Sequence, residues 1–155
     1  MNEAALRQLK DQIWNACIQK VQERMEEAGA AMDRAGEAVM AEEKSSAGDK
    51  YETGRAMGFL ERERYASVFA QAQKELAFYR NRKPTSPAVQ AEPGVLLVAE
   101  GLIILLATGI GKLEVAGHQV LVISIGSPLG QKIKGLKAGA SFLMGDASKK
   151  IMHLT

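Results

Sequence analysis

The first 83 residues contain no proline, and apolar side chains recur in them at the spacing of an α-helix. From residue 6 to residue 39 an apolar residue appears every three or four positions, with mostly polar and charged residues between them. This spacing predicts one helix with a single apolar stripe. At about 1.5 Å per residue, a helix of about 40 residues would be about 60 Å long. The stripe consists of Leu6, Leu9, Ile13, Cys17, Val21, Met25, Ala28, Met32, Ala35 and Val39.

A second helix is expected after residues 44–49, KSSAGD, where small and helix-capping residues gather. It is expected to end at residues 83–87, because the two prolines there cannot continue a helix. Neither helix can bury its stripe alone, so residues 1–83 are predicted to form an antiparallel coiled-coil hairpin. The second stripe consists of Met57, Leu60, Val68, Ala72, Leu76 and Tyr79.

The remainder of the chain has the character of a small β module. Short apolar runs rich in β-branched residues predict strands at residues 95–99, 102–107, 119–125, 141–144 and 150–154. Residues 128–136, PLGQKIKGL, predict one short helix. The predicted fold class is therefore α+β, with a helical hairpin (1–83), a linker (84–93) and a small, mostly antiparallel sheet carrying one helix (94–155).

Composition excludes several classes of protein. A net charge of +2 is too small for wholesale nucleic-acid binding. The single cysteine, Cys17, excludes an internal disulfide framework and a cysteine-based zinc site. The N-terminal segment is charged and lacks the apolar core of a signal peptide, and the longest apolar stretch, residues 95–107, is interrupted by Glu100. A cytoplasmic protein without membrane contact is expected.

Acidic residues gather where the hairpin is expected to turn. Residues 37–52 contain five acids and two bases, a local charge of −3. Asp49 and Glu52 are three residues apart, which places them on one face at the start of the second helix. Carboxylates are hard oxygen ligands suited to Mg²⁺. The simpler interpretation is that Asp49 is an N-cap and Glu52 its capping-box partner, and the two roles are compatible.

The other candidate sites have simpler structural explanations. Residues 109–112, GIGK, lack the first glycine and the hydroxyl residue of a phosphate-binding loop and are expected to form a turn. His118 and His153 have no second ligand at metal-binding spacing and are expected at the surface or at strand ends. Cys17 lies on the apolar stripe and is expected in the core.

Two stretches together resemble the Gre (GreA/GreB) transcript-cleavage factors of bacterial RNA polymerase. Residues 48–52, GDKYE, fit the Gly-Asp-x-x-Glu pattern of that family, and residues 42–56 resemble a Gre-like subgroup. Residues 127–130, SPLG, followed by residues 135–139, GLKAG, are similar to a second family segment. The order and lengths of the modules agree over nearly the whole chain.

The resemblance implies a mode of action. The β module would be FKBP-like and would dock on RNA polymerase, while the hairpin would enter the polymerase's secondary channel. Asp49 and Glu52 would act there in trans and help hold a Mg²⁺ ion shared with the polymerase for cleavage of backtracked RNA. Lys50, Tyr51 and Arg55 would contact RNA or polymerase. The implied docking residues are Ser127, Pro128, Leu129, Gly130, Gly135 and Gly139.

On this view the chain is an accessory factor and not an enzyme, and it has no cofactor of its own. Its partner would be bacterial RNA polymerase, with indirect contact to nascent RNA. Two alternatives stay open: a channel-binding regulator that competes with cleavage factors, and a structural module that self-associates through its coiled coil. A peptidyl-prolyl isomerase is disfavoured, because Phe142 is the only aromatic residue in the β half.

Overall fold

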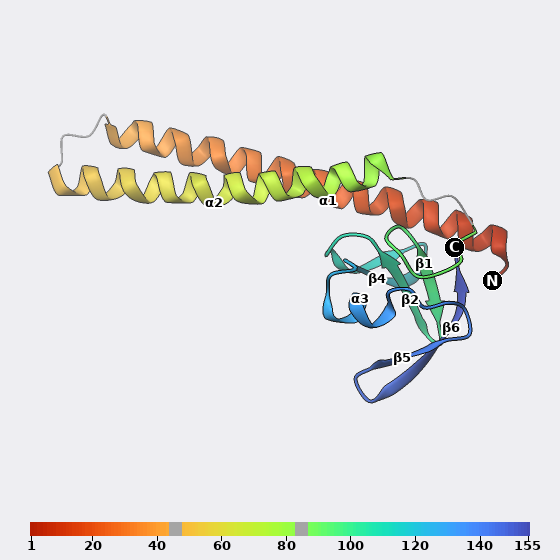
Figure 1. Ribbon diagram of the computed structural model, residues 1–155. Coiled ribbons are helices and arrows are strands. Elements are labelled where there is room, and N and C mark those ends of the chain that lie inside the picture. Colours follow the sequence, from red (N-terminus) through yellow and green to blue (C-terminus); the bar gives the residue numbers. More distant parts are fainter. Residues whose placement is uncertain (44–47, 83–86) are drawn as a thin grey trace. The chain divides into compact units, whose positions relative to one another are not determined.

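The computed structural model describes residues 1–43, 48–82 and 87–155, with the side chains of residues 42–52 excluded. It confirms the predicted α+β class: helices α1 (Glu3–Glu43) and α2 (Gly48–Asn81) form a hairpin and precede a six-stranded sheet (Figure 1). A short helix, α3 (Pro128–Ile133), lies between the fourth and fifth strands. The strands are β1 (Leu96–Ala99), β2 (Leu102–Leu106), β3 (Gly111–Val115), β4 (His118–Ile123), β5 (Ser141–Met144) and β6 (Ala147–Leu154).

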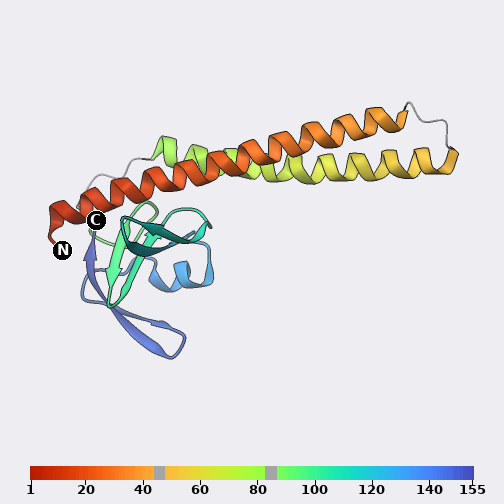
Figure 2. The same cartoon turned by 180° about the vertical axis from the view of Figure 1, so that it is seen from behind.

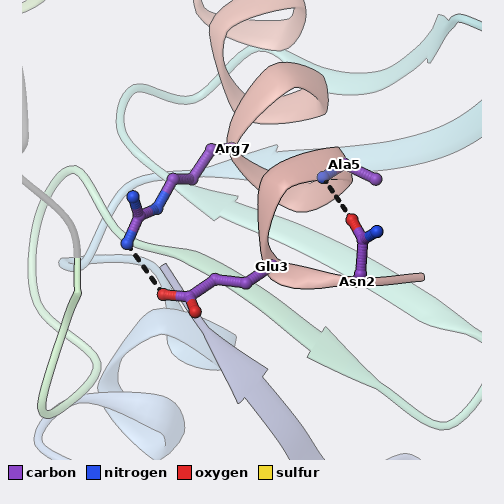
Figure 3. Close-up of polar contacts among 4 residues, drawn as sticks. All are labelled: Asn2, Glu3, Ala5 and Arg7. Atoms are coloured by element: carbon purple, nitrogen blue, oxygen red, sulfur yellow. Dashed lines mark hydrogen bonds and ion pairs between the residues drawn. The ribbon is translucent and has the colours of Figure 1, made fainter.

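The start of α1 is fixed by polar contacts within its first turns (Figure 3). The Asn2 side-chain oxygen accepts a hydrogen bond of 2.8 Å from the backbone N–H of Ala5. This is a helix N-cap, which satisfies a donor that has no partner inside the helix. One turn later, the Arg7 guanidinium forms an exposed ion pair of 2.8 Å with Glu3. These contacts define where the long helix begins.

The apolar stripe predicted for α1 is largely confirmed. Its buried members extend from Leu6 to Val39, and they recur at helical spacing along 33 residues of sequence. Met25 and Met32 are only partly buried, and Ala31 is buried beside them. Small residues at these positions allow the second helix to approach closely. The confirmed members are Leu6, Leu9, Ile13, Cys17, Val21, Ala28, Ala35 and Val39.

The stripe predicted for α2 is only half correct. Ala72, Leu76 and Tyr79 are buried as expected, but Met57 and Leu60 are 63% and 65% exposed. In this part of α2 the face toward α1 is instead formed by Gly58, Tyr65 and Phe69, of which Gly58 is fully buried. The physical reason is close approach: α2 passes so near to Val39 of α1 that a Cβ atom at residue 58 would lie 2.5 Å from that valine's Cγ2.

Two glycine substitutions test this close approach. Gly36 lies within α1, and a Cβ atom there would meet no other atom within 4 Å. Gly36→Ala is therefore expected to stabilise the hairpin by up to about 1 kcal/mol, the difference in helix propensity between glycine and alanine. Gly58→Ala gains the same propensity but collides with Val39, and overpacking of this kind costs about 1–3 kcal/mol. Thermal unfolding followed by circular dichroism should therefore show opposite shifts of Tm. Equal stabilisation by both variants would contradict the close contact.

The sheet has the strand order β3-β4-β2-β1-β6-β5 (Figure 2 shows it from behind). The expectation of a mostly antiparallel sheet holds for four strand pairs, but β2 and β4 pair in parallel, so the sheet is mixed. The strand that produces this arrangement, β3, was not predicted. It pairs with β4 through a two-residue turn at Ala116 and Gly117, both with positive φ, and this hairpin places β4 beside β2.

The core of the β module lies between the sheet and α3. Leu97, Ile104 and Ile151 from three neighbouring strands pack together with Ile133 of α3, and all four are completely buried. Phe142 of β5 packs in the same cluster. At about 25 cal/mol per Å² of apolar surface, such a cluster supplies most of the driving force for folding of a module this small.

The chain folds as two compact units, and both long helices contribute to each. One unit contains Met1–Ile18 and Phe78–Thr155, and the other contains Gln19–Ala77. Within the first unit, Ala91 is buried and exchanges backbone hydrogen bonds of 2.8 Å with Leu136 and Gly135. The functional boundaries at residues 83 and 93 stay a prediction. Over the described residues, no helix is apolar enough along a sufficient length to cross a bilayer.

Candidate functional site

The acidic pair lies in the first turn of α2, which begins at Gly48. Asp49 follows Gly48 in this turn, and its expected role as an N-cap with Glu52 as capping-box partner depends on side chains outside the described residues, so it stays a prediction. Asp49 and Glu52 are three positions apart in one helix, so the backbone places them on the same face. The partial positive charge at a helix N-terminus favours carboxylates in this turn. Their side chains lie outside the described part of the chain, so metal binding stays a prediction.

Three neighbouring residues were expected to contact RNA or polymerase. Lys50 and Tyr51 share the first turn of α2, and their side chains are also outside the described set. Arg55 follows one turn later, and its side chain is described. Its guanidinium carbon lies 5.5 Å from the centre of the Phe59 ring, the geometry of a cation–π contact. This stretch of α2 therefore carries positive charge directly after the two acids.

The SPLG segment, expected to dock on a polymerase, forms the beginning of α3. The Ser127 hydroxyl accepts a hydrogen bond of 3.0 Å from the N–H of Gly130 and donates one of 2.7 Å to the carbonyl of Ser124. Ser127 is therefore the N-cap of α3, and Pro128 occupies the first turn, where no N–H is needed. Leu129 packs against the core cluster of the module.

The three glycines of the same candidate surface have backbone roles. Gly130 is buried against the backbone of Ser124 and Ile125 and leaves no room for a Cβ atom. Gly135 and Gly139 have φ of +78° and +93°, a conformation that other residues rarely adopt. All six predicted docking residues thus have a structural task within this module. Their contact with a polymerase stays a prediction.

Cys17, the two histidines and the GIGK segment were expected to have structural roles. Cys17 is buried, and desolvation raises the pKa of its thiol to about 11, so it is not a reactive nucleophile at neutral pH. His118 begins β4 and His153 lies near the end of β6. Among the described residues, no three His, Cys, Asp or Glu side chains come together as metal ligands. The GIGK segment is a bend at its start, but Gly111 already belongs to β3.

A buried polar cluster around Tyr79 was not predicted as such from the sequence. The Tyr79 hydroxyl lies 2.7 Å from the hydroxyl of Thr108, and the Tyr79 carbonyl accepts a hydrogen bond of 3.1 Å from the Trp14 indole N–H. The Trp14 and Tyr79 rings meet edge to face with centres 5.1 Å apart. Burial raises the pKa of Tyr79, so its hydroxyl stays protonated. The cluster thus links Trp14 of α1, Tyr79 of α2 and Thr108 after β2 through buried contacts.

Lys10 is a second residue that the sequence pattern did not single out. Its side chain is 5% exposed, and its Nζ has no hydrogen-bond partner within the described parts of the chain. Desolvation lowers its pKa to about 8, and the carboxylate of Asp11 offsets only part of this effect. One sequence feature could have indicated the burial of Lys10: it lies between Leu9 and Trp14, two buried residues that make the buried face of α1 wider at this level.

Comparison with known proteins identifies no family for this chain. No protein-family model matches the chain, and no curated protein matches it. A solved structure described as that of the transcription factor Gfh1 is 16% identical, and the alignment covers 89% of this chain and 91% of that one. Its TM-score is 0.35. A likeness at this level carries no conclusion about function.

Proposed function

We propose that this chain is a Gre-like factor that binds bacterial RNA polymerase and brings Asp49 and Glu52 to the polymerase's active centre. The observation that carries the proposal is the position of these acids. They occupy one face of the first turn of α2, directly after the segment that joins the two antiparallel helices. A long hairpin that ends in carboxylates suits delivery of ligands into a recess of a larger protein.

The isolated chain is not expected to act as an enzyme. Two carboxylates are too few to hold Mg²⁺ securely, and the described residues supply no further group of acidic ligands. Asp49 and Glu52 would hold the ion together with ligands of the polymerase. When bound there, Mg²⁺ would supply a more acidic bound water and stabilise negative charge on the cleaved phosphodiester. The role of this chain is to position two oxygen ligands.

The test is a double substitution at the acidic turn. Asp49→Ala/Glu52→Ala is expected to bind core polymerase as the unmodified chain does but to lose Mg²⁺-dependent cleavage of RNA in stalled complexes. The matched control is Glu23→Ala/Glu26→Ala, an exposed pair with the same spacing on α1, which should retain cleavage. The measurement is the rate at which shortened RNA appears in a purified stalled complex.

The outcomes separate the proposals. Equal cleavage with the double variant and with the unmodified chain would contradict the role of the acidic turn. Binding to polymerase without cleavage by either protein would favour the non-cleaving regulator that competes for the channel. Absence of polymerase binding would contradict both. A structural, self-associating module would then be favoured by the exposed Met57 and Leu60 on α2.

A further inference from the structure

A row of exposed side chains runs along α2 outside its contact with α1. Met57 and Leu60 are 63% and 65% exposed, and Val68, two turns further on, is 39% exposed. Arg64 completes the row at spacings of three, four and four residues, so these four residues form one face of the helix. We call Met57, Leu60, Arg64 and Val68, together with the exposed Glu61 beside them, the outer face of α2. Contiguous exposed apolar patches can mark interaction surfaces, so this face is a candidate for one.

We propose that the outer face of α2 binds the outer face of a second copy of this chain, with the two α2 helices antiparallel. A two-fold axis between residues 62 and 63 places Met57 of one copy opposite Val68 of the other. The same axis sets Glu61 opposite Arg64, and Arg64 opposite Glu61. The face is therefore complementary to itself in both apolar contacts and charge, as a closed symmetric dimer requires.

The charges select this arrangement over the alternatives. Glu61 and Arg64 are both exposed, and within the described residues Glu61 forms no ion pair. The Arg64 guanidinium donates a hydrogen bond of 3.1 Å to the hydroxyl of the adjacent Tyr65 and lies 4.8 Å from the centre of that ring, and it forms no ion pair among the described residues. In a parallel dimer in register, each charge would face its own copy and repel it. The antiparallel register instead forms two ion pairs, one on each side of the axis.

The shape of the hairpin supports the same register. Beside Val68 lies a surface hollow lined by Ala28, Ala31 and Tyr65, and also by the charged residues Arg24, Glu27 and Arg34. In the proposed dimer the Met57 side chain of the other copy stands opposite this hollow. Methionine is unbranched and flexible, so it fills an irregular depression of this kind well.

The size of the contact sets its strength. The outer face spans three helical turns, about 16 Å at 1.5 Å per residue. It therefore buries less than the roughly 1,200 Å² of a standard stable interface, and association is expected to be weak and to depend on concentration. The proposal concerns the chain by itself and does not depend on the proposed binding to polymerase.

Sedimentation equilibrium of the full chain tests the dimer between roughly 10 µM and 1 mM, the range of weak interfaces. The average mass is expected to rise toward that of two chains. Leu60→Glu should raise the dissociation constant at least about tenfold, because it places a charge in the apolar contact. The matched control Val89→Glu, at an exposed apolar residue outside the helices, should leave it unchanged. A monomer at every concentration would overturn the proposal.

Charge reversal tests the register. Glu61→Arg and Arg64→Glu should each weaken association roughly three- to tenfold, because each creates two repulsive pairs across the axis. The double variant Glu61→Arg/Arg64→Glu restores both pairs with reversed sign and should recover the original dissociation constant. Circular dichroism verifies that every variant keeps its helices. A double variant as weak as the single ones would exclude the antiparallel register.

Discussion

Replacement of Gly130 by alanine is expected to destabilise the β module strongly. A Cβ atom at residue 130 would overlap the carbonyl oxygen of Ser124 and lie 2.8 Å from both the Cα and the carbonyl oxygen of Ile125. These are backbone atoms, so no side-chain rotation can relieve the collision. Relief requires the backbone of α3 and that of residues 124–125 to move apart, which would disturb the packing of Ile133 in the core. We expect a loss of about 3 kcal/mol or more, a large part of the stability of a module this size.

Two matched variants make this prediction specific. Gly126→Ala lies four residues earlier, where a Cβ atom would meet only the Ser124 hydroxyl at 4.0 Å, and it should be nearly neutral. Ser127→Ala removes the N-cap of α3 and should cost about 1 kcal/mol. Urea unfolding followed by Trp14 fluorescence reports on this unit, and amide exchange reports on its strands. A stable Gly130→Ala protein would contradict the observed packing of α3.

Replacement of Lys10 by methionine is expected to stabilise the protein at neutral pH. The lysine is buried, and its ammonium group has no hydrogen-bond partner among the described residues. Methionine has a similar length and no charge to desolvate. With partial screening by nearby solvent allowed for, we expect a gain of about 1–3 kcal/mol. Lys20→Met, at an exposed position of the same helix, serves as the control and should change the free energy of unfolding little.

The pH dependence gives this prediction its sign. The pKa of Lys10 is lowered from 10.5 in the unfolded chain to about 8 in the fold. Between these values the unfolded chain binds more protons, so the penalty from Lys10 is complete below about pH 8 and disappears as the pH rises toward 10.5. The advantage of Lys10→Met should therefore shrink over this range. Cys17 and Tyr79 are present in both proteins, so their titration cancels in the difference. An advantage that does not change with pH would contradict the desolvated ammonium.

The sequence was sufficient to predict the elements whose patterns are strong and local. The absence of proline and the regular spacing from Leu6 to Val39 defined α1, and the prolines after residue 83 set the end of α2. The predicted strand at residues 141–144 coincides with β5. The acidic pair was predicted to share one face of a helix start, and the backbone of α2 agrees. These features depend only on the residues within each element.

The remaining features depend on contacts between elements. The large side chains of Met57 and Leu60 suggested that these residues face α1, but both are exposed. The side of α2 that carries Gly58 faces α1 instead, because a glycine there allows the two helices to approach closely. Strand β3 alternates between partly buried and exposed residues and has a weak apolar signal. The parallel pairing of β2 and β4 depends on how the β3–β4 hairpin folds back onto β2. No short sequence pattern predicts that placement.

The pairing of β1 with β6 has a consequence for the rate at which the protein folds. β1 pairs on one side with β2, its neighbour in sequence, and on the other with β6, which is the last strand in chain order. The same compact unit also includes Met1–Ile18, with the beginning of α1, and Trp14 packs there against Tyr79. Trp14 therefore depends on a partner that lies 65 residues later in the sequence. Contacts between elements so far apart in sequence slow folding, because a long stretch of chain must be closed into a loop before they form.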